Sequence, residues 1–192
     1  SEAKISRGFV KVGSIVKDSV KQIEKYYLNK EPITGTASGF NDLDMLTSGF
    51  QASDLIIIAG RPSMGKTSLG LSMARNIGLH LGLPVAVFSL EMSKEQIVMR
   101  MLCSEARVSS TKVRSGKLSE SDFPRLVDAA AKLSQADIYI DDTASISILE
   151  MRAKARRLHR EKPLSLILVD YLQLMRGSSR RSERREQEIS EI

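Results

Sequence analysis

The chain has 192 residues, of which 42% are hydrophobic, and its 29 lysines and arginines outnumber 23 acidic residues to give a net charge of +6. This length suits one domain with a sizeable core, and no apolar run approaches the ~20 residues of a membrane-spanning helix, so we expect no membrane segment. The single cysteine excludes an intramolecular disulfide, and the two histidines are too isolated for a zinc site.

An amphipathic helix is predicted over residues 14–28, with Ser14 as its cap and Pro32 shortly after its end. Its apolar residues recur on one face: Ile15, Val16, Val20, Ile23 and Tyr27. This face packs either on the rest of the same chain or on a neighbouring subunit. We therefore divide the chain into a linker region, residues 1–32, and a main domain, residues 33–192.

The main domain opens with a glycine-punctuated segment, residues 34–54, in which one short helix capped near Asn41 is expected. Residues 55–59 (LIIIA) form a continuous apolar run. Such a run is typical of a strand that is buried on both faces, as in parallel sheets.

Strands and helices then alternate along the chain. Strands are predicted over residues 84–91, 137–142 and 164–170, and helices over residues 66–81, 93–106, 110–114, 121–133 and 147–161. Ser93 and Gln96 form a capping box, and the basic helix 147–161 is expected to bury Ile148, Leu149, Ala153 and Leu158. The alternation predicts an α/β fold with a mostly parallel sheet. Because few strands are found, we expect the domain to be incomplete at its C-terminal end.

Residues 60–67 (GRPSMGKT) match the phosphate-binding P-loop, between a predicted buried strand and a predicted helix. In this motif Lys66 reaches the β- and γ-phosphates of ATP, and the Thr67 hydroxyl binds Mg²⁺. The predicted nucleotide-binding residues are Arg61, Pro62, Ser63, Met64, Gly65, Lys66, Thr67 and Ser68.

Acidic residues end three of the predicted strands. Asp170 follows a buried strand, which suits the second ligand of the metal. Glu91 would emerge at the same edge of the sheet, either as the group that orients the attacking water or as a helix-start acid favoured by the helix dipole. Asp141 and Asp142 are adjacent, so their side chains point to opposite faces, and we interpret them as strand-end or helix-capping acids.

Four motifs in order carry a resemblance: "TGTASGFNDLD", "GRPSMGKTS", "VFSLEMS" and "LVDYLQLM". Together they resemble DnaB-type replicative DNA helicases over residues 8–192. The resemblance implies a RecA-like P-loop ATPase, preceded by a linker helix that docks on the adjacent protomer of a ring hexamer. It assigns the Walker A pair to Lys66 and Thr67, the Walker B acid to Asp170, and water activation to Glu91.

The resemblance also implies an enzyme that hydrolyses ATP with Mg²⁺ to translocate on single-stranded DNA and unwind duplex. Primase and a helicase loader are the expected partners, in a bacterial-type cytoplasm and on the nucleoid during replication. The arginine finger and the main DNA-contacting loop of the family are expected outside this sequence, so these 192 residues alone should be weakly active or inactive. The alternatives are a RecA- or KaiC-like recombinase or signalling ATPase, and a nucleotide-binding module without significant turnover.

The C-terminal stretch 175–188 carries five arginines against three glutamates. Arg176, Arg180 and Arg181 are interpreted as a channel loop that makes weak phosphate contacts with DNA. The alternative is a solvated charge run, since Arg184 and Glu188 have the spacing of a helical ion pair and no aromatic residue is present to stack on bases.

Overall fold

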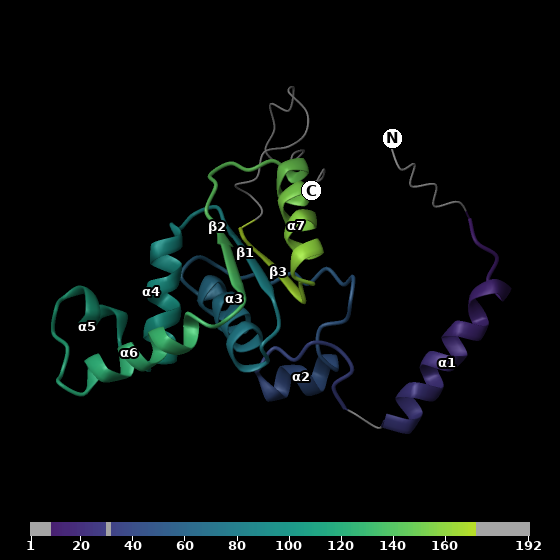
Figure 1. Cartoon of the computed structure of the whole chain (residues 1–192), viewed down its shortest axis with the longest axis horizontal. Coiled ribbons are helices and arrows are strands. Elements are labelled where there is room, and N and C mark those ends of the chain that lie inside the picture. Colours follow the sequence, from purple (N-terminus) through teal and green to yellow (C-terminus); the bar gives the residue numbers. More distant parts are fainter. Residues whose placement is uncertain (1–8, 30–31, 172–192) are drawn as a thin grey trace.

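A computed structural model describes residues 9–29 and 32–171 (Figure 1). The helices are α1 (Gly13–Asn29), α2 (Asn41–Thr47), α3 (Lys66–Arg75), α4 (Lys94–Glu105), α5 (Ser110–Arg114), α6 (Asp122–Leu133) and α7 (Ile148–Glu161). A π-helical turn, η1 (Asn76–His80), extends α3. The strands are β1 (Val85–Ser89), β2 (Ile138–Asp141) and β3 (Leu166–Asp170).

The three strands form a parallel sheet in the order β2-β1-β3, which confirms the predicted α/β class. Val85 pairs with Ile138 on one side and with Leu166 on the other, so all three strands start at the same edge. Their carboxyl ends therefore share the opposite edge, which is where ligands bind in open α/β sheets.

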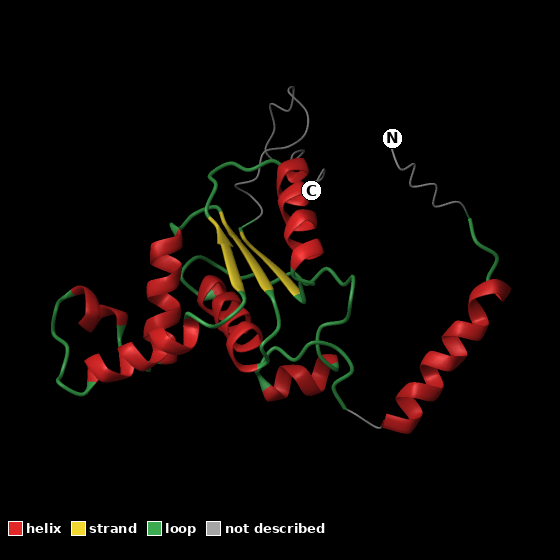
Figure 2. Ribbon diagram, viewed as in Figure 1, coloured by secondary structure: helices red, strands yellow, loops and turns green. Residues whose placement is uncertain are grey.

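Helices cover both faces of this sheet (Figure 2). Val85 and Val87 of β1 pack with α3 and α4, in a cluster that includes Leu71, Ile77 and Ile97. Ala86 and Phe88 face the other way and pack with Ala155 of α7. Every residue of β1 is buried, as its central place requires.

Residues 55–59 are not the buried strand that their composition predicts. They form no strand in the structure, and the side chains of Leu55 and Ile57 are 83% and 70% exposed. A strand needs a hydrogen-bonding neighbour, and residues 55–59 pair with none of the three described strands. An apolar run favours burial, but a strand also needs a neighbouring strand to which its backbone can hydrogen-bond.

Local signals at the other elements are mostly reliable. The capping box of Ser93 and Gln96 is present, and Ser147 accepts a hydrogen bond from the Glu150 N–H at the start of α7. Two predicted helix caps and one predicted strand end differ in the structure. Ser14 lies inside the first turn of α1, the α2 cap position is Phe40 without a side-chain bond, and β1 ends at Ser89, two residues before Glu91.

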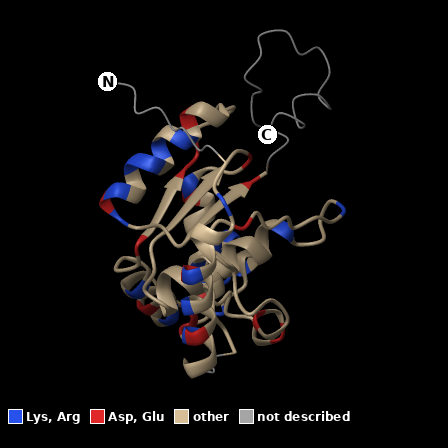
Figure 3. Cartoon of the chain, turned by 90° about the vertical axis from the view of Figure 1, so that its right-hand side faces the viewer, with Lys and Arg blue, Asp and Glu red and all other residues tan. Residues whose placement is uncertain are grey.

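The buried side of α7 also differs from the prediction. Ala155 is buried, and the residues packed beside it on the helix are Ile148, Met151 and Leu158. These four positions follow the three- and four-residue spacing of one helical face, whereas Leu149 is 68% exposed and Ala153 is also exposed. Figure 3 shows the basic residues along this helix, and its exposed arginines are Arg152, Arg156, Arg157 and Arg160.

Candidate functional site

The direction of α3 brings the P-loop to the carboxyl edge of the sheet. A Cβ atom on Gly78, just after α3, would clash with Ile138, the first residue of β2. A Cβ atom on Gly70, eight residues earlier, would lie 3.0 Å from Leu168 in the middle of β3. The helix therefore runs antiparallel to the strands, and its first residue, Lys66, lies towards their carboxyl ends.

The P-loop backbone makes two unusual turns before the helix begins. Ser63 has φ 65° and Gly65, at the N-cap of α3, has φ 86°. Glycine adopts this region freely, whereas serine does so at a cost, and such strain is common at ligand sites. The Lys66 ammonium folds against the loop and donates hydrogen bonds to the carbonyl oxygens of Gly60 (2.8 Å) and Arg61 (3.2 Å).

Strand register places the predicted metal ligand Asp170 and the predicted catalytic Glu91 at the same edge. Ser89 pairs with Asp170, and the Leu90 N–H donates to the Asp170 carbonyl oxygen at 2.8 Å. Glu91 follows directly and is exposed in the turn between β1 and α4. The structure thus brings the P-loop, Asp170 and Glu91 to one edge of the sheet, as the sequence predicts.

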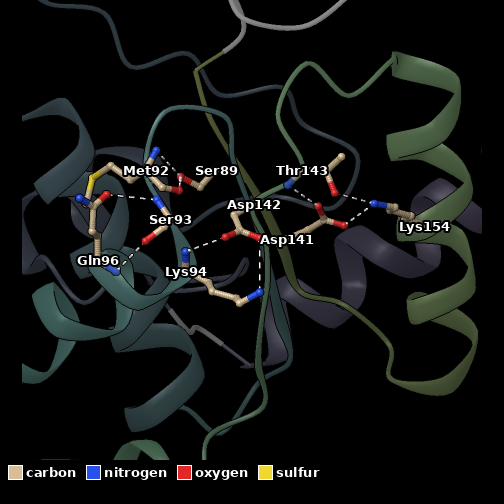
Figure 4. Close-up of polar contacts among 9 residues, drawn as sticks. All are labelled: Ser89, Met92, Ser93, Lys94, Gln96, Asp141, Asp142, Thr143 and Lys154. Carbon is tan, nitrogen blue, oxygen red and sulfur yellow. Dashed lines mark hydrogen bonds and ion pairs between the residues drawn. The ribbon is translucent and has the colours of Figure 1, made fainter.

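Asp141 and Asp142 diverge at the end of β2 (Figure 4). Asp142 accepts a hydrogen bond from the Lys94 N–H (3.0 Å) and thereby caps α4. Asp141 turns to α7, where the Lys154 ammonium donates to it at 2.8 Å. Burial acts to raise the pKa of Asp141, but hydrogen bonds from Lys154 and Thr143 outweigh it and hold the pKa below its usual value. Both residues are structural acids, as interpreted from the sequence.

Thr67 and Asp170, the predicted metal ligands, carry hydroxyl and carboxylate oxygens of the kind that Mg²⁺ prefers. Within residues 9–29 and 32–171, no group of three or more His, Cys, Asp or Glu side chains converges on one point. Mg²⁺ in nucleotide sites keeps several waters and is bound through one or two protein oxygens together with substrate phosphates. The hydroxyl of Thr67 and the carboxylate of Asp170 are donors of this kind.

One residue of the site is missed by sequence reasoning. Ser89 ends β1 after four apolar residues, is 1% exposed, and hydrogen-bonds both backbone groups of Met92. The available signal is a hydroxyl at the end of an otherwise apolar strand, shortly before Glu91. The predicted DNA-binding residues Arg176, Arg180 and Arg181 lie outside the described residues.

A groove of about 760 Å³ lies beside the site, between α3, α4 and α5. Its apolar lining includes Leu71, Met92 and Met99, and Arg100 and Arg114 stand at it. Cys103 also lines it and is buried, as predicted, and burial raises the pKa of its thiol.

The chain is similar to known proteins along its whole length. Residues 35–192 match the family described as DnaB-like helicase C terminal domain. The chain is 48% identical to the replicative DNA helicase DnaB of Geobacillus stearothermophilus and 45% identical to the replicative DNA helicase DnaC of Bacillus subtilis. All of this chain aligns in both cases, but it spans only 42% of either relative.

Solved structures agree with this similarity. One, described as an ATPase domain, superposes with a TM-score of 0.85 at 31% identity, over 94% of this chain and 64% of the other. A DnaB-like replicative helicase, described with its interactions with primase, superposes with a TM-score of 0.83 at 28% identity, over 96% of this chain and 44% of the other.

Proposed function

The chain belongs to the family of DnaB-like helicase C-terminal domains, and from that membership we propose that it is the ATP-driven motor of a replicative DNA helicase. Its fold is the RecA-like α/β core that the sequence motifs imply. The observation that carries the proposal is the meeting of the P-loop, Glu91 and Asp170 at the carboxyl edge of one parallel sheet. This edge is where a nucleotide binds in such folds.

Each residue at this edge has a role in the proposed reaction. Residues 61–68 would cradle the phosphates, with Lys66 on the β- and γ-phosphates and the α3 N-terminus adding its positive end. Thr67 and Asp170 would hold Mg²⁺, which neutralises charge on the phosphates when bound. Glu91 would orient the attacking water and accept its proton.

The partners of the complete protein are part of the proposal. This chain spans 42% of its bacterial relatives, so single-stranded DNA, a homo-hexamer, primase and a helicase loader are proposed for the protein as a whole. Primase is named with one of the similar solved structures. From its bacterial relatives we propose that the protein works in the cytoplasm, on the nucleoid during replication. Separately, none of the helices among the described residues is long and apolar enough to cross a membrane.

We assign α1 and its flanks, residues 1–32, to a linker that docks on a second copy of the chain. All of the described residues of α1 are exposed, and Figure 1 shows the helix lying apart from the sheet. The surface that we propose for this apolar face is the groove between α3, α4 and α5, whose lining includes Leu71, Met92 and Met99. An apolar stripe that none of the described residues covers favours the neighbouring subunit over the intramolecular alternative.

Replacement of Lys66 tests the proposal. In the full-length protein, Lys66→Ala should abolish DNA-stimulated ATP turnover, because it removes the cation that contacts the transferred phosphate. Nucleotide affinity measured beside turnover separates the alternatives. Tight nucleotide binding by the unsubstituted protein without turnover would indicate a nucleotide-binding module, and filaments in place of closed rings under electron microscopy would favour a recombinase-like relative.

A further inference from the structure

The turn that carries Glu91 is held by a buried serine. Ser89 is the last residue of β1 and is 1% exposed, although the preceding β1 residues are all apolar. Its hydroxyl donates to the Met92 carbonyl oxygen at 2.7 Å and accepts from the Met92 N–H at 3.2 Å (Figure 4). One side chain thus satisfies both backbone polar groups of the residue after Glu91.

Glu91 therefore lies between two fixed neighbours. On one side, the Leu90 N–H is bonded to the Asp170 carbonyl oxygen of β3. On the other, Met92 is bonded to Ser89, and its side chain packs against the core cluster under α3 and α4. Leu90 is buried and Met92 is half-buried, whereas Glu91 between them is exposed to solvent.

A second set of contacts fixes the far end of the turn. Ser93 caps α4 in a reciprocal box with Gln96. The next residue, Lys94, donates its N–H to Asp142 of the adjacent strand end at 3.0 Å. The turn is consequently tied to β1, β3 and the end of β2, and the side chain that ties it beside Glu91 is Ser89.

We propose that Ser89 is a positioning residue for Glu91: its hydroxyl fixes the backbone from which Glu91 orients the attacking water. The proposal rests on the role of Glu91 in the proposed function. Without the hydroxyl, the Met92 N–H and carbonyl lose this partner and the turn can shift. A displacement of about 1 Å at a reacting group can cost roughly 10² in rate.

The test uses the full-length protein with single-stranded DNA, assayed for ATP turnover and nucleotide affinity. Ser89→Ala should lower kcat about tenfold or more while leaving the Kd for ATP within about twofold, because it changes the reacting geometry and not the phosphate cradle. The matched control is Ser134→Ala, which removes a serine hydroxyl that donates to the Ala131 carbonyl oxygen at the C-terminal end of α6, before β2 begins at the opposite edge of the sheet, and should leave kcat unchanged. If Ser89→Ala does not fold, Ser89→Cys, of similar size but with a weaker donor and acceptor, takes its place.

A double-mutant cycle with Glu91→Gln separates positioning from simple destabilisation. If Ser89 acts through Glu91, adding Ser89→Ala to Glu91→Gln should lower kcat by less than about twofold further. An unchanged kcat in Ser89→Ala, or a full multiplication of the two effects, would overturn the proposal for Ser89. A normal kcat in Glu91→Gln alone would instead overturn the proposed role of Glu91, so the two failures are distinguishable.

Discussion

Asp44 shows at the scale of single residues why the segment before the P-loop has its sequence. This carboxylate is 2% exposed and accepts hydrogen bonds from the Ser38 N–H (2.7 Å) and the Gly39 N–H (3.1 Å). Gly39 has φ 84°, and a Cβ atom there would clash with the Asn76 side chain, which itself donates to the Ser38 carbonyl oxygen at 3.1 Å. Ser38 and Asp44, which are both buried, and the exposed Gly39 of "SGFNDLD" thus tie this segment to the end of α3.

Asp44→Ala should lower the free energy of unfolding by about 2–3 kcal/mol, because two N–H groups lose a charged acceptor in a buried place. Urea denaturation measures the change. Asp42→Ala, an exposed aspartate in the same helix, is the control and should shift stability by less than about 0.5 kcal/mol. Equal effects of the two substitutions would show that the buried hydrogen bonds of Asp44 add nothing to the free energy of unfolding.

Motifs predict which single residues gather at the site. Lys66, Thr67 and Asp170 are predicted from motif and strand context, and Glu91 from strand context together with the family resemblance. The fold brings their elements to one edge, and their roles stay predictions. Ser89 is not predicted, because its role depends on a hydrogen bond to Met92 that only the folded turn creates. A side-chain contact of this kind leaves no repeating pattern in the sequence, so sequence analysis does not find it.

At the scale of elements, one ion pair connects α7 to the sheet. Lys154 of α7 lies 2.8 Å from Asp141 of β2 and also donates to Thr143 at 2.9 Å. Hydrogen bonding to Asp141 raises the pKa of Lys154, and the pKa of Asp141 is lowered from its ordinary value of 3.8. The contribution of Asp141 to the free energy of unfolding is therefore present above pH 3.8 and is lost as pH falls below it. The contribution of Lys154 is present below pH 10.5 and is lost as pH rises above it.

Lys154→Met should reduce the free energy of unfolding by about 0.5–1 kcal/mol near neutral pH, the range for partly exposed pairs. The difference from the unsubstituted protein should start to shrink as pH falls through 3.8, and should approach zero once Asp141 is protonated in the folded protein as well, at the lower pKa that its hydrogen bonds give it. Urea denaturation between about pH 3 and pH 7 measures this dependence, with Arg152→Met on the outer face of α7 as control. A difference that stays constant down to pH 3 would contradict the role of Asp141.

The elements themselves are largely predictable, since helical periodicity and serine caps depend on neighbouring residues. The starts of α4 and α7 follow from Ser93 and Ser147. The apolar run 55–59 shows the limit, because a strand is defined by its neighbour and not by its own composition. The choice of buried face on α7 fails for a related reason: Leu149 and Met151 are both apolar, and only packing against the sheet decides between them.

At the scale of the whole molecule, α1 stands out because its apolar face is uncovered. This helix of 17 residues buries none of them, and its apolar face includes Ile23 (64% exposed) and Tyr27 (76% exposed). Full burial of a large apolar side chain contributes about 1.5–3 kcal/mol, so a docked helix would add substantially to assembly.

The double substitution Val20→Asp with Ile23→Asp should shift the full-length protein from the proposed hexamer towards smaller species, with at least about tenfold weaker association. Sedimentation velocity measures the distribution. Gln22→Asp adds a negative charge on the polar side of α1 and should leave the assembly unchanged. If both variants gave the same distribution of species, the alternative that α1 packs on its own chain would be favoured.

The carboxyl edge of the sheet is proposed to hydrolyse ATP, with Glu91 orienting the water. The most direct measurement is DNA-stimulated ATP turnover of the full-length protein with Glu91→Gln, beside Glu95→Gln, an exposed glutamate at the start of α4. We predict that Glu91→Gln lowers kcat by about 10²- to 10⁴-fold at unchanged ATP affinity, because a general base is lost, while Glu95→Gln retains turnover. Normal turnover by Glu91→Gln would contradict this role.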